Sequence, residues 1–253
     1  MLSLNAPQDV STDLQAPRAS SLRHPHSTGT RTEVDRVYDD IFDAVMDRRL
    51  LPGAKLTEAT LCSVFDCTRA TVRAALAQLA HDKIVLIEPN RGAFVWQPQA
   101  KETRDVFAMR RALECTTIDM LLELPDLARR LEPLYGMVGR ERQAFECGDR
   151  ISWIRLSNAF HVELAQLLDN DVLIDILHSL CARTSLIIAY YDTPGQSACS
   201  YFEHQDILDK LARGDAAGAK SAMQHHLQDC EQRMSEPGKA PAADPWLAFS
   251  VKR

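Results

Sequence analysis

Two arginines four residues apart have the chemistry and the spacing to contact DNA. If residues 67–76, CTRATVRAAL, form a helix, Arg69 and Arg73 lie one turn apart on one face. Val72 and Leu76 then face the core, so both guanidinium groups project into solvent from the first two turns. A guanidinium donates paired hydrogen bonds in a geometry that matches guanine edges and phosphate oxygens.

The segments around this helix predict how it is presented. An arginine pair alone is usually a solvated surface, but here a short helix that Thr57 can cap and the tight turn FDC precede it, and the hairpin pattern IVLIEPNRGAFVW follows. Three helices and a hairpin are the order of a winged helix-turn-helix, which presents its recognition helix to the major groove. The candidate DNA contacts are Thr68, Arg69, Thr71, Arg73, Arg91 and Gly92.

Three histidines in the second half of the chain have the chemistry of a metal or anion site. His161 borders the apolar stripe of one predicted helix, and His204 and His226 continue the apolar lines of two others. A single inward histidine is usually a hydrogen-bonded core residue. Three on converging helices indicate a shared site, because one divalent ion satisfies all three imidazoles together.

Apolar periodicity and composition divide the chain into two domains with flexible ends. Residues 1–30 are rich in Ser, Thr, Pro and His, and we expect a disordered arm there. The winged helix-turn-helix domain is predicted at residues 31–98, an all-helical domain at 101–235 and a flexible tail at 236–253. The predicted fold class is therefore mainly α, with strands only in the hairpin.

The helices that must position these side chains follow from the same periodicity. A first helix runs from Thr32 toward Leu50. In the second half, helices are predicted near residues 101–123, 126–146, 150–168, 171–191, 199–213 and 215–234. The breaks between them are predicted at Pro125, Cys147-Gly148, Asp169-Asn170, Thr193-Pro194-Gly195 and Gly214-Asp215.

Composition excludes several other classes of protein. The formal net charge is −6, so a generally basic nucleic-acid coat is excluded and any DNA contact depends on local arrangement. The seven cysteines are scattered without a C-x-x-C pair, which is typical of reduced thiols and not of a disulfide framework or a thiolate zinc site. The sequence shows neither a membrane span nor a signal peptide, and we expect a cytoplasmic protein.

Residues 32–96 resemble the DNA-binding domain of GntR-type transcriptional regulators. The family pattern is PG-x-x-L-x-E, then an S-R-x-x-V-R-x-A-L recognition helix, then a hairpin with Gly in its turn. The matching residues are Pro52, Gly53, Leu56, Glu58, Arg69, Val72, Arg73, Ala75, Leu76 and Gly92. Thr68 stands where Ser is usual and keeps the capping hydroxyl. Thr71 replaces a common Pro, and Ala74 replaces a common Glu, which alters the charge beside the arginines.

Residues 105–230 resemble the all-helical effector (FCD) domain of the FadR-like branch of this family. The residues that carry the resemblance are Arg110, Leu113, Glu114, Phe160, His161, His204, Ile207, His226 and Leu227. Metal-binding members usually add an Asp one turn before the first histidine, where this chain has Ser157. The resemblance implies zinc or nickel on His161, His204 and His226, with water or a carboxylate effector in the open positions. The alternative is a metal-free pocket whose histidines bind an anionic effector directly.

Four further residues are candidates for the effector site. The resemblance implies that Arg110 holds the effector's carboxylate, and the alternative is an ion pair with Glu114 that contributes little on a surface. Asn158, Arg183 and Tyr190 are predicted to line the same cavity.

The combined hypothesis is a ligand-responsive transcriptional repressor. We expect a homodimer on an inverted-repeat DNA operator, because a two-fold protein on a two-fold site doubles the base contacts. A small organic acid in the helical domain would shift the arrangement of the winged domains. The alternatives are a metal-responsive regulator, whose effector is the ion, and a metal-dependent hydrolase. We expect no enzyme, since no proton-transfer group stands out.

Overall fold

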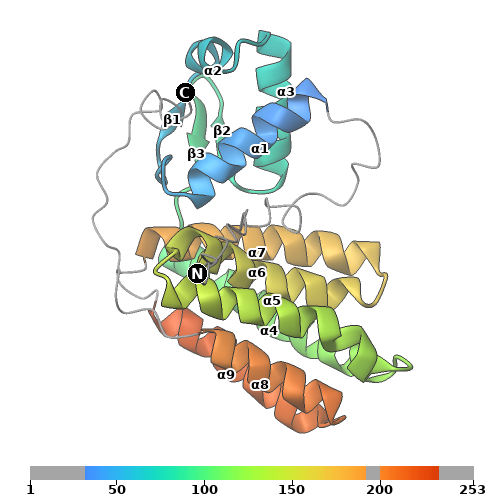
Figure 1. The fold of residues 1–253 in the computed structure, drawn as a ribbon. Helices are drawn as coiled ribbons and strands as arrows, with labels where there is room; N and C mark the ends of the chain where they lie inside the picture. The colour runs from blue at the N-terminus through green and yellow to red at the C-terminus, as the bar shows by residue number, and fades with distance from the viewer. Residues whose placement is uncertain (1–31, 192–199, 234–253) are drawn as a thin grey trace, which may run out of the picture.

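The computed structural model describes residues 32–191 and 200–233, without the side chains of residues 151, 189, 190 and 233. The expected arm, the expected tail and the predicted Thr193-Pro194-Gly195 turn lie outside these residues. Within them the predicted fold class is confirmed: a winged helix-turn-helix precedes a group of long helices (Figure 1).

From residue 32 onward, where the described structure begins, the first half contains three helices and three short strands. The elements are α1 (Glu33–Met46), β1 (Lys55–Leu56), α2 (Glu58–Phe65), α3 (Arg69–His81), β2 (Val85–Glu88) and β3 (Gly92–Val95). Thr32 starts α1 with a capping box, in which its hydroxyl accepts from the backbone of Asp35 and the Asp35 carboxylate accepts in return. The helix ends earlier than predicted because Arg48 adopts a left-handed conformation, with φ of 58°.

The sheet has one strand more than predicted. Its order is β1-β3-β2 and all pairs are antiparallel. The additional strand β1 is only two residues long, so alternation of apolar residues could not reveal it. Lys55 lies opposite Phe94, and Leu56 packs into the core opposite Ala93. This strand ties the segment before α2 to the wing.

The second half consists of six helices in the described residues. They are α4 (Ala100–Leu122), α5 (Leu127–Glu146), α6 (Arg150–Gln166), α7 (Asp171–Tyr191), α8 (Ser200–Ala212) and α9 (Ala216–Arg233). Each lies within about two residues of its predicted range. The breaks inside the described residues have a common cause, since they contain positive φ angles at Asp126, Gly148, Asp169 and Gly214.

The long helices pack against one another in a continuous apolar core. The closest pairs are α5 with α6, α6 with α7, α4 with α9 and α8 with α9. In Figure 1, α6 and α7 lie nearest the winged domain and α8 and α9 lie farthest from it. The polar site described below is therefore built inside a helical bundle, where α4, α5, α6, α8 and α9 all contribute.

Two arginines of the helical half contact residues of the winged half. Arg155 on α6 pairs with Asp47 just after α1 and lies 3.5 Å from an Asp43 oxygen. Arg183 on α7 pairs with Glu102 and lies over the Trp96 ring, 5.2 Å from its centroid. Helix α1 also packs against α7 (Figure 1). The two halves are thus joined by charged contacts as well as by the connection after β3.

No helix among residues 32–191 and 200–233 combines the length and the apolar character that crossing a membrane requires.

Arg155→Ala should uncouple the two halves. The substitution removes a partly buried, charge-assisted contact, so we expect the winged half to lose about 1.5–3 kcal/mol of stability and to melt before the helical half. Differential scanning calorimetry would show two transitions in place of one. Arg104→Ala, at an exposed position on α4, is the control and should melt as the wild type does. A single unshifted transition in the Arg155 variant would contradict the coupling.

Candidate DNA-reading helix and buried three-histidine site

Helix α3 begins where the capping pattern predicts. The Thr68 hydroxyl accepts from the backbone N–H of Thr71 at 3.2 Å, and the two hydroxyls lie 3.0 Å apart. Val72 and Leu76 are buried against the rest of the winged half. With this start and this inner face, Arg69 and Arg73 lie on the exposed side of the first two turns.

Arg73 has a partner that the sequence did not suggest. Its Nε donates to Oε1 of Glu58 at 2.7 Å, although the guanidinium side chain remains 67% exposed. The hydrogen bond from Arg73 lowers the pKa of Glu58. An exposed pair of this kind contributes little stability, but it orients the guanidinium across the turn between α2 and α3. Only the position of Glu58, in the first turn of α2, could have indicated this contact.

The hairpin tip is basic, as predicted. Arg91 is 70% exposed, pairs with Glu88 and lies 5.5 Å from the ring centroid of Phe94. Gly92 has a φ of 100°, a conformation that a residue with a side chain rarely adopts. The glycine therefore allows the tight turn that places Arg91 at the end of the wing.

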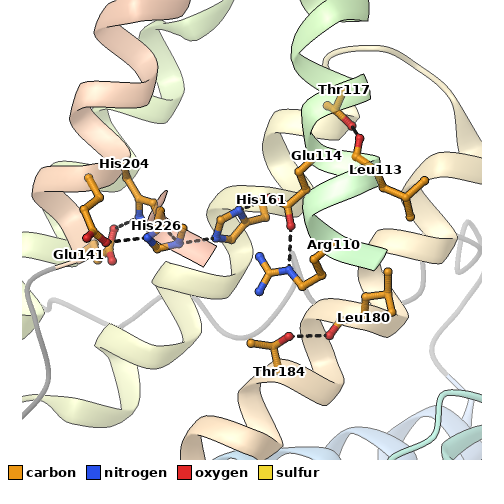
Figure 2. A network of polar contacts seen from close by, with 11 residues as sticks. Arg110, Leu113, Glu114, Thr117, Glu141, His161, Leu180, Thr184, His204 and His226 are labelled. Carbon is orange, nitrogen blue, oxygen red and sulfur yellow. Dashed lines mark hydrogen bonds and ion pairs between the residues drawn. The ribbon is translucent and has the colours of Figure 1, made fainter. Parts of the chain in front are cut away.

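The three predicted histidines meet in the interior of the helical half. Nε2 of His226 lies 3.2 Å from Nε2 of His204 and 3.3 Å from Nε2 of His161. Each side chain is at most 3% exposed. Figure 2 shows the three rings converging from different helices, with His226 between the other two. Ligand atoms of all three lie within 4.8 Å of one another.

Each imidazole is held from behind by its own carboxylate. Nδ1 of His161 lies 2.5 Å from Glu114, Nδ1 of His204 lies 2.8 Å from Glu141, and Nδ1 of His226 lies 2.7 Å from Glu203. A carboxylate acceptor at Nδ1 selects the tautomer with its proton on Nδ1, which leaves a lone pair on Nε2. Three lone pairs then face one point and cannot hydrogen-bond to each other.

This donor set fits a divalent cation. Burial lowers the pKa of His161 and of His226, which favours the neutral form that binds metals. The three histidines, their three carboxylates and Arg110 form one polar network. Its three carboxylates and one guanidinium give a net charge of two negative units, which matches the charge of a divalent ion. Three imidazole nitrogens at one point are a known zinc-binding set that leaves a coordination position open.

Arg110 forms the predicted ion pair, but inside the protein. Its Nε lies 2.7 Å from the Glu114 carboxylate, and both side chains are 2% exposed. Burial alone would raise the pKa of Glu114, but Arg110 and His161 lower it to about 2. Within the described residues, Nη2 of Arg110 is buried and has no hydrogen-bond partner. A buried donor of this kind is costly unless something accepts from it.

Ser157 connects to the site through a second serine. Its Oγ donates to Oγ of Ser200 at 3.2 Å, and the Ser200 hydroxyl donates to Glu141 at 2.5 Å. The indole N–H of Trp153 also donates to Ser200. Ser157 is therefore linked to the Glu141 carboxylate only through the Ser200 hydroxyl, and it does not supply a charge of its own.

The remaining effector candidates are placed differently from the prediction. Asn158 is buried, and its amide donates to the Ile154 carbonyl one turn back. Among the described residues, the hydrogen bonds and ion pairs of Arg183 go to Glu102 and not to the histidines. The Tyr190 side chain lies outside the described residues.

Two carboxylates of the site were not predicted from the sequence. Glu141 is fully buried on the apolar side of α5, in register with Leu134 and Val138. Its charge at an apolar position was the available signal. Glu203 precedes His204 directly, and nothing in the sequence separates it from an ordinary surface acid. His225, beside His226, is exposed and pairs with Asp229 as a solvated residue would.

Comparison with protein families gives two matches that together cover about three quarters of the chain. Residues 33–95 match the bacterial regulatory proteins of the gntR family, and residues 105–229 match the FCD domain. The first match contains α1 to β3, and the second contains all three histidines and Arg110.

Similar proteins are transcriptional regulators and not enzymes, as expected for this chain. The HTH-type transcriptional repressor RspR of Escherichia coli is 24% identical over 188 residues, which are 74% of this chain and 82% of that protein. A transcriptional repressor assigned to D-xylose utilisation in Paenarthrobacter nicotinovorans is 27% identical over 78% of this chain and 87% of its own length. A GntR regulator structure from a Rhodococcus species has a TM-score of 0.70 at 25% identity, covering 81% of this chain and 98% of that one.

The metal-free protein should lose stability as the pH falls through the range of free histidine. The folded state keeps His161 and His226 neutral, whereas the unfolded chain protonates them below about pH 6.5. We therefore expect the free energy of unfolding to fall below this pH, by at most about 1.4 kcal/mol per pH unit for each imidazole. Urea denaturation of chelator-treated protein at pH 7.5 and 5.5 measures this.

His226→Gln should show a smaller pH dependence than the wild type, because one buried imidazole is gone. His225→Gln is the matched control at an exposed neighbouring position and should keep the full dependence. Identical pH profiles for His226→Gln and the wild type would contradict the assignment.

Proposed function

The chain belongs to the gntR family of bacterial regulatory proteins, and we propose that it is a repressor that binds its operator as a homodimer and responds to a small carboxylate. The carboxylate binds in the helical half, where a zinc or nickel ion on His161, His204 and His226 forms part of its site. The single observation that carries the effector site is the convergence of three buried Nε2 atoms, each with a carboxylate behind it.

The DNA contacts are proposed from the exposed face of α3 and the tip of the wing. Arg69 and Arg73 project from the first two turns beside Thr68 and Thr71, and Arg91 stands at the hairpin tip. A helix placed with these turns in the major groove reaches only a few base pairs. Two copies related by a two-fold axis would read both halves of an inverted repeat, which supports a homodimer as the binding species.

The metal is proposed because it removes two unfavourable features at once. It accepts the three converging lone pairs, and it balances the excess of carboxylates over guanidinium groups in the network. Bound there, a zinc or nickel ion would supply a positively charged point for an anionic ligand. The residues of the chain hold the imidazoles in place through Glu114, Glu141 and Glu203 and exclude water from the ring faces.

Arg110 is proposed as the residue that receives the effector's carboxylate. Its Nε is committed to Glu114, but its buried Nη2 has no acceptor in the described residues. A carboxylate oxygen satisfies such a donor by a charge-assisted hydrogen bond. The ion-free alternative, in which the histidines bind the anion directly, requires protonated imidazoles, and burial opposes that for His161 and His226.

A hydrolase is not supported by the same geometry. A metal-activated water needs a nearby group that can take its proton. The three carboxylates beside the histidines already accept from Nδ1 atoms. The site is therefore built to hold charge and not to move protons.

Arg69→Ala should weaken specific DNA binding by about 1–3 kcal/mol, the contribution of a bidentate contact to a base edge. The operator would first be selected from random duplexes with the wild-type protein, and affinities then measured by fluorescence anisotropy at one salt concentration. Gln78→Ala, exposed later on the same helix, is the control. Unchanged affinity of the Arg69 variant would remove α3 from base recognition.

Protein purified without chelator should contain about one equivalent of metal, measured by elemental analysis. Zinc at a hundredfold excess over its dissociation constant should stabilise metal-free protein by about 2.7 kcal/mol. His204→Gln should lose both effects, and His225→Gln should keep them. The metal proposal would be contradicted if the purified protein contained no metal and zinc did not raise its melting temperature.

The identity of the effector is tested separately from the metal. With zinc held constant, small organic acids are titrated into an operator-binding assay. A change of operator affinity with an acid supports the proposal, and a response to zinc alone would instead support a metal-responsive regulator.

A further inference from the structure

We propose that the cleft between the outer face of the wing and the beginning of the helical half is a second ligand site, which binds an organic anion with a flat apolar body. The cleft has a volume of about 910 Å³, within the range of small-molecule sites. It is lined from the winged half by β2, β3 and the end of α3, and from the helical half by Glu102 and Arg183. This site goes beyond the proposed function and does not involve the histidines.

The apolar wall of the cleft is a face of the sheet that carries Leu86 and Phe94. Leu86 and Phe94 lie opposite each other in the strand register, so their side chains share this face. Trp96 directly follows β3, two residues after Phe94, and also lines the cleft. Leu86 is 49% exposed. An exposed leucine beside two aromatic rings at the meeting of two domains is typical of a ligand-binding surface.

The charges around this wall favour an anion. Lys83, Arg91 and Arg183 line the cleft against Glu88 and Glu102, which leaves one cation in excess. Lys55 adds to this positive character, since its Nζ lies 5.7 Å from the Phe94 ring centroid.

Arg183 is the most specific feature of the cleft. Its Nη2 donates to Glu102 and its guanidinium lies over Trp96, but its Nε is buried and has no partner in the described residues. A carboxylate bound beside Arg183 would accept from it, while a flat ring would cover Leu86 and Phe94. The ligand class is therefore an aromatic carboxylate.

The position of the cleft gives such a ligand a regulatory effect. Its walls come from both halves of the protein, next to the contact of Trp96, Glu102 and Arg183 that joins them. A ligand that bridges both walls binds one arrangement of the halves better than others, and this difference would change operator affinity. The cleft would therefore be a second effector site, in addition to the histidine site.

The test uses the full chain with 2-naphthoate as the probe in isothermal titration calorimetry. We expect one saturable site, and at least tenfold weaker binding of 2-naphthylmethanol, which has the same ring system without the charge. Leu86→Glu should weaken naphthoate binding at least tenfold. Gln78→Glu, which adds the same charge at an exposed position outside the cleft, and His226→Gln should bind the probe as the wild type does.

Three results would overturn the proposal. They are the absence of saturable binding to the wild type, equal binding of the alcohol, and equal binding by the Leu86→Glu and Gln78→Glu variants. Operator affinity of Leu86→Glu without any probe is measured in parallel. Weaker DNA binding by this variant than by Gln78→Glu would assign the cleft to the DNA interface instead.

Discussion

The helical half depends on the pairing of three buried imidazoles with three carboxylates, of which Glu114 and Glu141 are buried and Glu203 is partly exposed. A carboxylate in the protein interior is tolerated only with charge and hydrogen-bond partners, and an imidazole there needs a partner on each nitrogen. Glu114, Glu141 and Glu203 satisfy Nδ1 of the three histidines and thereby turn every Nε2 toward one point. The helices must therefore pack in a way that brings these six side chains together, so this network selects one arrangement of the bundle.

The same helices carry the connection to the winged half. Helix α6 bears His161 in the site and Arg155 at the contact with Asp47, six residues earlier on the chain. Helix α4 bears Glu102 at the other contact and Arg110 and Glu114 in the site. A ligand that shifts either helix by a fraction of a turn changes both ends together, because packed helices move as rigid units. The charged contacts suit this role, since they break at lower cost than an apolar interface.

The features that the sequence predicted depend on residues that are close in the chain. The features that it did not predict depend on residues that are far apart in the chain. The cap at Thr68, the inward Val72 and the helix breaks at Gly148 and Gly214 depend on near neighbours, and all are as expected. The histidines were found because His161 borders the apolar stripe of its helix, and His204 and His226 continue the apolar lines of theirs. Strand β1, the pairing of Arg73 with Glu58 and the place of Glu141 depend on segments brought together by folding. Arg183 was misplaced for the same reason, since its partner lies 81 residues away.

Ser157 shows how one substitution changes the electrostatics of the whole site. An aspartate at this position, as in the family pattern, would add a further negative charge to a network in which carboxylates already exceed guanidinium groups. With serine there, the remaining excess equals the charge of one divalent ion. The hydroxyl instead bonds through Ser200 to Glu141, so it helps to hold His204. In the proposed metal site it would leave a coordination position open. An effector carboxylate that fills this position would place its negative charge next to the ion, so metal and effector would each strengthen the binding of the other.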